Sequence, residues 1–296
     1  MRSDARSRRP RLPSETIGIL GTGLIGSSIG LRSRARGDRV LGWDRAPDSA
    51  AQALARGALD AVAADETALV AEADVIVLAT PLAATLASLE RLASRPPRAS
   101  LIIDVASVKG PVHSAGARIE AFVATHPIAG SERSGPVAAR ADLFEGHAWT
   151  YDPDATPSAT ERARTFIAAM GSRPVPIPSA LHDRIAALTS HLPQLLAVAL
   201  AGRLAARLEQ DGVLELCGTG IRSMTRLGAS SWAMWEGILS ANAPAVAQEV
   251  RELSTVLSQI ADELEAERSH SLQSHFAKAA AAVGSLSENE APQNGV

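Results

Sequence analysis

A glycine motif near the N-terminus constrains the fold more than any other feature of this sequence. The hexapeptide Gly21-Thr22-Gly23-Leu24-Ile25-Gly26 follows the short apolar run 17–20 and opens an apolar helical run that reaches Leu31. A strand, a tight glycine turn and a helix in this order are typical of the first unit of a dinucleotide-binding sheet. The first glycine permits the turn, the second lets the backbone approach a pyrophosphate, and the third lets the helix pack on the strand.

The residues after the next apolar run indicate which dinucleotide would bind. Asp44 ends the run 40–43, roughly twenty residues after the glycine motif. A carboxylate at this place accepts hydrogen bonds from the adenosine ribose hydroxyls and repels a 2′-phosphate, so we predict NAD as the cofactor. Arg45 is adjacent and would tolerate a 2′-phosphate, which leaves NADP as the alternative.

The chain alternates short apolar runs with helical runs over its first two thirds. Such alternation predicts an α/β fold of the Rossmann type, a doubly wound parallel sheet with helices on both faces. The predicted strands are 17–20, 40–43, 75–79, 101–105 and 121–125, with weaker candidates at 148–151 and 174–178, and helical spacing is clear at 49–56 and 83–93. Thr80 and Pro81 follow the run 75–79, where a strand end would line the cofactor crevice, although Pro81 could serve only to end the strand.

The character of the sequence changes near Ser179, after which β-type runs are almost absent. We predict a helix over 181–208 with a kink at Pro193, and one long helix over 243–283. The predicted organisation is therefore a disordered tail (1–14), a dinucleotide-binding domain (15–178), an all-helical substrate and dimerisation domain (179–284) and a second tail (285–296).

The long C-terminal helix carries a narrow apolar seam. Its members are spaced alternately four and three residues apart: Val246, Val250, Leu253, Leu257, Ile260 and Leu264. Such a seam is narrower than the stripe that a globular helix usually buries. It fits packing within its own domain or, as we predict, a homodimer interface.

Composition excludes several classes of function. The 296 residues are 46% hydrophobic and 21% charged, with a net charge of −3 and 3% aromatic residues, which disfavours nucleic-acid binding. The single cysteine, Cys217, excludes a disulfide framework and a cysteine-based zinc site, and we predict no metal. We find no continuous run of about 20 apolar residues, so we expect no membrane span. The Arg-rich segment 1–13 lacks the apolar run of a signal peptide, and we expect a cytoplasmic protein.

Two polar clusters follow predicted strands, where a parallel sheet delivers side chains to its crevice. One is 104–109, which contains Ser107, and the other is 125–132, which contains His126. A histidine at this place can accept the proton of a substrate hydroxyl while hydride leaves the same carbon, and a nearby serine can orient it. From the residues alone, a purely structural histidine remains the alternative.

The second cluster resembles the signature of prephenate and arogenate dehydrogenases of the tyrosine pathway. It reads Thr125-His126-Pro127-Ile128-Ala129-Gly130-Ser131-Glu132-Arg133-Ser134-Gly135, and Asp104-Val105-Ala106-Ser107-Val108-Lys109 resembles its partner motif. His182-Asp183 with Thr189-Ser190-His191-Leu192-Pro193, and Met224-Thr225-Arg226-Leu227 with Trp235, resemble the two motifs of the family's helical domain. The resemblance covers about residues 15–283 in family order.

The resemblance implies roles for individual residues. His126 would be the catalytic histidine that hydrogen-bonds the ring hydroxyl, and Ser107 would contact both that hydroxyl and the histidine. Arg226 would bind a substrate carboxylate, for which a guanidinium group is well suited. Ser131 and Glu132 would lie at the pocket mouth, while His191 would contact substrate or cofactor, or else only pack in its helix.

The sequence departs from the family pattern at two places. Gln194 stands where many prephenate-using members have a second histidine, which leaves the preference for the substrate side chain open. Ser223 replaces an acidic residue three positions before Arg226, and Arg222 is close enough to share its role. We predict an NAD-dependent prephenate dehydrogenase. The alternatives are an arogenate dehydrogenase, a relative acting on an amino-substituted prephenate, and an NAD-binding sensor without catalysis.

Overall fold

The computed structural model describes residues 14–130, 133–210 and 212–290. The chain divides into two compact units, Met1–Ala243 and Pro244–Val296. Each unit is described separately.

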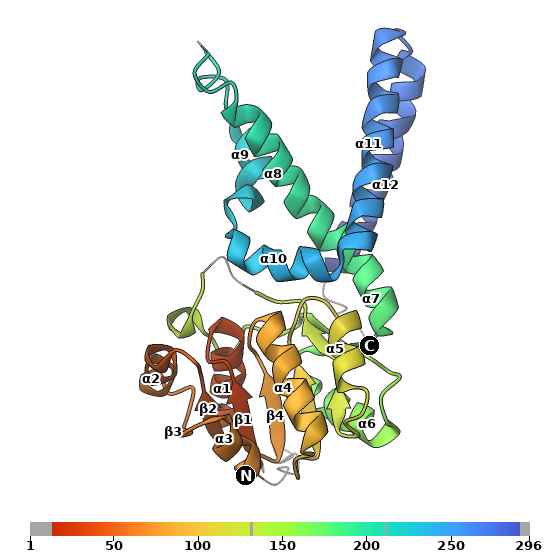
Figure 1. Ribbon diagram of the computed structural model, residues 1–296. Coiled ribbons are helices and arrows are strands. Elements are labelled where there is room, and N and C mark those ends of the chain that lie inside the picture. The colour runs from red at the N-terminus through yellow and green to blue at the C-terminus, as the bar shows by residue number, and fades with distance from the viewer. Residues whose placement is uncertain (1–13, 131–132, 211, 291–296) are drawn as a thin grey trace, which may run out of the picture. The chain divides into compact units, whose positions relative to one another are not determined.

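A six-stranded parallel sheet forms the centre of the first unit (Figure 1). Its order is β3-β2-β1-β4-β5-β6. The strands are β1 (Thr16–Leu20), β2 (Arg39–Trp43), β3 (Ala61–Val62), β4 (Val75–Leu78), β5 (Leu101–Asp104) and β6 (Phe122–Val123). In this order the strand sequence reverses direction between β1 and β4, and ligands of open α/β sheets bind beyond the carboxyl ends of the strands at such a point.

Alternate side chains of the strands build two apolar layers. Ile17, Val75 and Leu101 face one layer with α1 (Leu24–Arg36) and α6 (Pro157–Ala169). The residues between them face the other layer, which is covered by α3 (Glu66–Glu72), α4 (Leu82–Ser94) and α5 (Gly110–Gly116), while α2 (Pro47–Ala55) follows β2. The predicted doubly wound fold is confirmed. The sequence pattern missed β3, which is only two residues long.

A second, three-stranded sheet follows the parallel one. It consists of β7 (Thr125–Pro127), β8 (Ala148–Tyr151) and β9 (Arg173–Pro176), and a short turn of helix, η1 (Pro136–Ala138), lies between β7 and β8. β7 is antiparallel to β8, with His126 opposite Thr150. The predicted strand 121–125 is therefore wrong as one element, because the chain leaves the parallel sheet after Val123 and pairs in a different sheet from Thr125.

The helical part of the first unit begins with α7 (Ser179–Ala186), a π-helical turn η2 (Ala187–His191) and α8 (Leu192–Ala205). Pro193 is the second residue of α8 and has no N–H, so the usual bond to the carbonyl of Thr189 cannot form. A wider π turn directly precedes it, so the helix predicted over 181–208 is interrupted before Pro193 and ends at Ala205, while the kink stays a prediction. The remaining elements are α9 (Thr219–Thr225), η3 (Arg226–Ala229) and α10 (Trp232–Ala241).

The helical stretch Ser179–Ala205 has the length and composition of a membrane span. Its mean hydropathy reaches 1.5 over the most apolar window, which corrects our expectation that no such segment exists among the described residues. The apolar residues of α8 raise this value. The same stretch also holds buried polar side chains, such as His182 and Asp183, that bond to other elements of the first unit. Of the most apolar window, 33% is buried inside the structure.

The second unit is formed by α11 (Ala243–Glu265) and α12 (Ser269–Glu290). The prediction of one helix over 243–283 is wrong, because the chain turns at Glu267, whose φ of 53° is left-handed. His275 Nε2 lies 3.5 Å from Glu263 Oε2 across that turn. α12 continues through 285–290, where the sequence predicted a frayed tail, and most of the two predicted tails lies outside the described residues.

Candidate active site

The turn between β1 and α1 requires glycine at two positions. Gly21 has a φ of +92°, and a Cβ there would lie 2.3 Å from the carbonyl oxygen of Ala79. A Cβ on Gly26 would lie 2.0 Å from the carbonyl oxygen of Gly21. Gly23 differs, because a Cβ there would meet no atom within 4 Å. Open space above the second glycine is what a closely approaching pyrophosphate needs.

The first turn of α1 offers donors toward that space. Gly23 is the N-cap of α1, and no side chain caps this helix end. The backbone hydrogen bonds of the helix begin with Ser27 N, which donates to the carbonyl oxygen of Gly23. The amides of Leu24 and Ile25 therefore remain available at a positive helix end. These backbone groups fit a dinucleotide, as the sequence predicted.

Asp44 lies at the carboxyl end of β2, beside the glycine turn. Its Oδ2 accepts hydrogen bonds from Thr22 N (2.7 Å) and Thr22 Oγ1 (3.1 Å), and its Oδ1 accepts one from Ala46 N (2.9 Å). The carboxylate is thus fixed in place and is half-buried. Its remaining lone pairs are suited to ribose hydroxyls. Arg45 next to it is exposed.

Thr80 and Pro81 lie where β4 ends and α4 begins, as predicted. Pro81 is the N-cap of α4, and Thr80 Oγ1 lies 2.9 Å from Thr85 Oγ1 in the first turn of that helix. Ala79, directly before them, contributes the carbonyl beneath Gly21. This segment therefore lies against the glycine turn and begins α4, and its contact with the cofactor stays a prediction.

A buried ion pair fixes the strand that carries His126. Lys109 Nζ contacts Asp104 Oδ2 and donates to the carbonyl oxygen of Thr125 at 2.5 Å. Asp104 Oδ1 in turn accepts from Thr125 N at 2.9 Å. Lys109 and Asp104 are both almost fully buried. Burial lowers the pKa of Lys109, although the charge of Asp104 opposes that shift. The pair joins the end of β5 to Thr125, the first residue of β7, and so fixes the backbone directly before His126.

His126 belongs to a linear network of side chains. Its Nδ1 lies 3.0 Å from Nε2 of His182, and Nδ1 of His182 lies 2.9 Å from Asp183 Oδ1. Asp183 also accepts from the backbone amides of Lys109 (2.7 Å, Oδ1) and Gly110 (2.8 Å, Oδ2), at the start of α5. β7, α7 and α5 are therefore joined at one point by hydrogen bonds to two histidines and a carboxylate.

The electrostatics of this network keep His126 neutral. Burial lowers the pKa of His126 well below its usual value, the positive charge of Lys109 lowers it further, and protonation of His182 or His191 would add to the effect. Burial alone would raise the pKa of Asp183, but hydrogen bonds from His182, Gly110 and Lys109 bring it below the usual value. At neutral pH the network thus ends in a carboxylate at Asp183 and an uncharged imidazole at His126.

His191 is joined to the same network through Asn242. Asn242 Nδ2 donates to the carbonyl oxygen of Asp183 at 2.7 Å and lies 3.3 Å from His191 Nδ1. Burial lowers the pKa of His191, so its ring is neutral too. Its Nε2 is buried without a hydrogen-bond partner, as is Nε1 of Trp235, whose ring lies edge-on at a centroid distance of 5.9 Å. Two buried donors in ring contact therefore lack an acceptor among the described residues.

The other predicted residues lie at varying distances from this network. Ser107 is half-buried in the loop between β5 and α5, and among the described residues it makes no hydrogen bond to His126, so the predicted contact stays a prediction. Gln194 Nε2 donates to the carbonyl of Leu227 at 2.8 Å, which ties α8 to η3, the turn that Arg226 begins. Ser131 and Glu132 lie outside the described residues.

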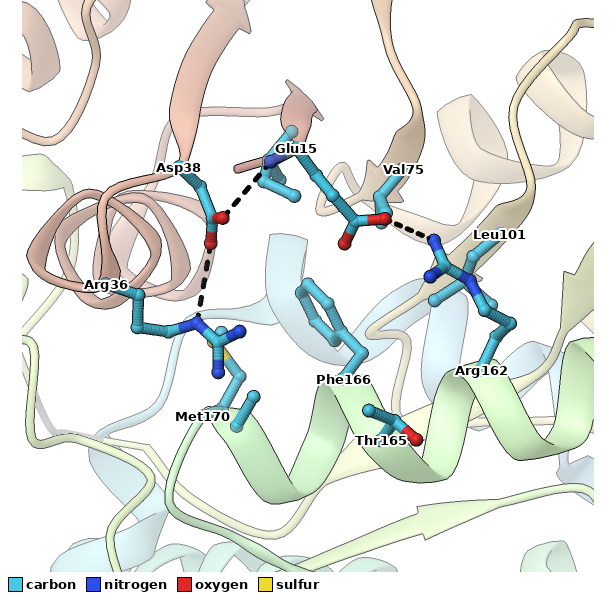
Figure 2. Close-up of a pocket in the computed structure, with 11 residues that line it drawn as sticks. Glu15, Arg36, Asp38, Val75, Leu101, Arg162, Thr165, Phe166 and Met170 are labelled. Atoms are coloured by element: carbon cyan, nitrogen blue, oxygen red, sulfur yellow. Dashed lines mark hydrogen bonds and ion pairs between the residues drawn. The ribbon is translucent and has the colours of Figure 1, made fainter. Parts of the chain in front are cut away.

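A cavity of about 140 Å³ lies elsewhere, at the amino ends of the strands (Figure 2). Glu15, Val75 and Leu101 line it, together with Phe166 of α6 and Arg162. Arg162 Nη2 is paired with Glu15 Oε1 at 2.6 Å. His126 and the glycine turn lie at the carboxyl ends, so this cavity does not belong to the candidate active site.

Sequence reasoning missed the part that His182 and Asp183 play. The two residues belong to one of the motifs that resemble the family, but the sequence analysis assigned neither of them to the active site. The signal was present as an adjacent His-Asp pair at the start of the helical domain. The contact of His182 with His126, 56 residues away, depends on α7 lying against β7 and could not be inferred from spacing.

Comparison with known proteins gives the same result from an independent direction. The family model described as "Prephenate dehydrogenase, nucleotide-binding domain" matches residues 29–175, and "Prephenate dehydrogenase, dimerization domain" matches residues 178–278. A probable prephenate dehydrogenase of Streptomyces niveus, NovF, is 35% identical over 84% of this chain and 68% of its own length.

Two solved structures show the same fold. The arogenate dehydrogenase of Synechocystis has a TM-score of 0.78 and 25% identity, covering 92% of this chain and 99% of its own. The prephenate dehydrogenase of A. aeolicus, solved with hydroxyphenyl propionate and NAD+, has a TM-score of 0.85 and 22% identity, covering 94% and 100%.

The glycine turn at the carboxyl edge of a doubly wound sheet, with a neutral histidine beyond it, defines the class of nucleotide-binding dehydrogenases. Within that class, the chain belongs to the prephenate dehydrogenase family. Its first domain is a nucleotide-binding domain, and the predicted all-helical second part is the family's dimerization domain.

Proposed function

We propose that this protein is an NAD-dependent prephenate dehydrogenase, which converts prephenate to 4-hydroxyphenylpyruvate and carbon dioxide in tyrosine biosynthesis. The observation that carries the proposal is the neutral imidazole of His126, held by His182 and Asp183 in a chain with a nucleotide-binding domain of this family. A base that is uncharged at neutral pH is what the oxidation of a hydroxyl group requires.

The cofactor site is assigned to the glycine turn and its surroundings. The amides of Leu24 and Ile25 would bind the pyrophosphate above Gly23, and Asp44 would bind the adenosine ribose, with Thr80 and Pro81 along the wall. Bound NAD⁺ supplies a hydride acceptor.

Asp44→Asn should weaken NAD binding and reduce the preference for NAD over NADP, which titration with both dinucleotides would measure. Equal use of NADP by the wild-type protein would assign that pocket to Arg45 instead.

The chemistry at the substrate balances with one base. The C–H bond at the hydroxyl-bearing carbon breaks and its electron pair leaves as hydride. His126 Nε2 accepts the hydroxyl proton meanwhile. The ring carboxylate then leaves as carbon dioxide, and the electron pair of the broken C–C bond enters the ring, which becomes aromatic. The resulting phenolate oxygen recovers its proton from His126.

The substrate's charges need fixed partners. We assign the ring carboxylate to Arg226, which begins η3 beside the Gln194 contact to Leu227. Ser107 would bind the ring hydroxyl together with His126. Ser131 and Glu132 would lie at the mouth of the pocket. Arg226→Ala should raise KM strongly for whichever substrate is used, because it leaves a carboxylate without a partner. A larger effect of Arg222→Ala would assign the role to that arginine.

We infer a preference for prephenate over arogenate from two buried hydrogen-bond donors of the protein that have no acceptor among the described residues. His191 Nε2 and Trp235 Nε1 are buried without partners, and the contact from Asn242 Nδ2 to His191 Nδ1 leaves the proton of His191 on Nε2. The side chain of prephenate ends in keto and carboxylate oxygens, which accept hydrogen bonds. Arogenate carries an ammonium in place of the keto oxygen, and an ammonium only donates.

The assay that tests the function follows NAD⁺ reduction with each substrate. We expect kcat/KM for prephenate to exceed that for arogenate by at least about tenfold, since opposing two donors with an ammonium costs more than one lost hydrogen bond. Trp235→Phe, which removes one donor and keeps the ring, should reduce this ratio, and Gln194→His should change it several-fold. Preference for arogenate would establish the alternative activity. Tight NAD binding without turnover of either substrate would indicate a sensor.

Three further assignments rest on the family and the sequence. We propose a homodimer formed through the helical region, a domain boundary at 178/179, and action in the cytoplasm. The first is supported by the dimerization-domain match over 178–278 and by the apolar seam of α11. The second is supported by the break between the two family matches.

A further inference from the structure

We propose that Asp183 and His182 form a positioning relay that fixes the tautomer of His126, so that its Nε2 is the bare nitrogen that receives the substrate proton. This inference deepens the proposed function and rests on it, because it assigns a task to two residues that the reaction itself does not touch. Neither residue needs to contact substrate or cofactor.

The relay starts at a group that can only accept. The carboxylate of Asp183 receives two backbone amides, Lys109 N on Oδ1 at 2.7 Å and Gly110 N on Oδ2 at 2.8 Å. Burial alone would raise the pKa of Asp183, but these two bonds and the one to His182 bring it below its usual value, so the carboxylate is ionised and anchored to the start of α5. Asn242 holds the backbone of the same residue through its carbonyl oxygen at 2.7 Å. Asp183 is therefore a fixed acceptor.

The tautomers then follow in order. His182 Nδ1 lies 2.9 Å from Asp183 Oδ1, so this nitrogen must carry a proton. A neutral His182 consequently has a lone pair on Nε2. His126 Nδ1 lies 3.0 Å from that nitrogen and must be the donor of the bond between them. The remaining nitrogen of His126, Nε2, is left with a free lone pair.

The same order of bonds stabilises the charged base. When His126 takes up a proton on Nε2, the positive charge spreads over a ring whose Nδ1–H already points at His182. His182 in turn points at the negative charge of Asp183, and its ring is almost fully buried. A carboxylate that orients a catalytic imidazole in this way changes the rate without contacting the substrate. Here the imidazole of His182 lies between the carboxylate of Asp183 and His126 and links the two through hydrogen bonds.

The test compares three substitutions in the full-length protein. Asp183→Asn removes the negative charge of the relay, while its amide oxygen can stay at the Oδ1 position and accept from Lys109 N and His182 Nδ1. We expect kcat to fall by about a hundredfold or more, while KM for NAD⁺ stays within about twofold. His182→Gln places an oxygen near the position of Nε2 that can still accept from His126, so kcat should stay within about tenfold of wild type. His182→Phe offers no acceptor and should resemble Asp183→Asn.

A matched control is available on α5. His113 Nδ1 lies 3.0 Å from Asp152 Oδ2, so it also forms a His-carboxylate pair, but in the described part of the chain it makes no hydrogen bond or ring contact with His126. His113→Gln should leave kcat close to the wild-type value. If it lowered kcat as much as His182→Phe does, the effect would come from general loosening of the fold and the relay would be wrong.

Nitrogen NMR of the histidine rings reads the tautomer directly. In ¹⁵N-labelled wild-type protein with NAD⁺, His126, assigned by its loss in His126→Asn, should show a protonated Nδ1 and a bare Nε2. This pattern should persist in His182→Gln and be lost in His182→Phe, which offers Nδ1–H no acceptor. A protonated Nε2 in neutral wild-type His126 would overturn the proposal, as would equal kcat for His182→Phe and His182→Gln.

The outcomes separate the relay from the proposed function. If wild-type protein turned over neither prephenate nor arogenate, the function would be wrong, while the ring spectra would still decide the relay. If Asp183→Asn failed to fold because α5 lost its cap, the two His182 variants would decide it, since they leave the carboxylate and its amide donors in place.

Discussion

At the scale of single residues, His126 carries the strongest expectation. His126→Asn keeps a polar side chain of similar reach but cannot accept a proton. We expect kcat to fall by about a hundredfold or more, in the range of a lost general base, with nearly unchanged NAD binding. Steady-state kinetics and dinucleotide titration measure the two quantities. Turnover close to wild type would show that His126 is structural.

The acid limb of the pH profile follows from the environment of His126. Burial and the charge of Lys109 place the pKa of His126 well below the ordinary histidine value, and Asp183 acts on it only through His182. The neutral ring is the active form, so activity is lost only as pH falls through this lowered pKa. We expect kcat/KM to remain near its maximum down to below about pH 6.5. A limb centred above that value would contradict the assignment.

Protein stability should depend on pH in the same direction. In the unfolded chain His126 and His191 titrate at ordinary values, whereas burial lowers both pKa values in the folded protein. Between these values the unfolded chain binds more protons, so the free energy of unfolding falls as pH falls below about 6.5.

The residues of the candidate site divide by what a linear sequence can reveal. His126 and the glycines could be predicted from the sequence, because a polar residue after a strand and a G-x-G-x-x-G spacing each have a local physical meaning. The link from His126 to His182 was not, because it depends on α7 lying against β7. The orphaned nitrogens of His191 and Trp235 were likewise invisible, since only packing shows which donors lack acceptors.

At the scale of elements, the strand-turn-helix at the N-terminus allows a matched pair of substitutions. Gly21→Ala introduces a Cβ 2.3 Å from the Ala79 carbonyl at a φ of +92°, so we expect a loss of about 2 kcal/mol or more in the free energy of unfolding. Gly23→Ala meets nothing within 4 Å and should leave stability nearly unchanged, yet weaken NAD binding by about tenfold or more. Thermal unfolding and NAD titration separate the two. Equal NAD affinity in Gly23→Ala and wild type would move the pyrophosphate elsewhere.

The elements that the sequence predicted are those with a continuous pattern. β1, β2, β4 and β5 are buried apolar runs, and their positions were predicted to within a residue or two. β3 has two residues and too little pattern to detect. The break at Glu267 was missed because the apolar spacing continues up to Leu264 and no glycine or proline marks the turn that follows.

At the scale of the whole molecule, the change in sequence character along the chain can be compared with the family matches. Alternating strands and helices stop near Ser179, and the family matches change between 175 and 178. The contacts within the chain place the boundary between the two compact units after Ala243, because α7 to α10 and the nucleotide-binding part form one unit. The network of His182, Asp183 and Asn242 explains this, since it connects helical residues to β7 and α5.

The homodimer is the prediction that belongs to this scale. In the single chain Leu257 and Leu264 of the α11 seam are 54% and 60% exposed, and an apolar row of this length is normally covered. We expect wild-type protein to sediment as a dimer at micromolar concentration. Leu257→Glu places a charge in the middle of the seam and should raise the dimer dissociation constant by about tenfold or more. Gln52→Glu adds a carboxylate on exposed α2 and should leave it unchanged. A wild-type protein that sediments as a single chain at these concentrations would remove the dimer, and equal dissociation constants for both variants would move the interface away from α11.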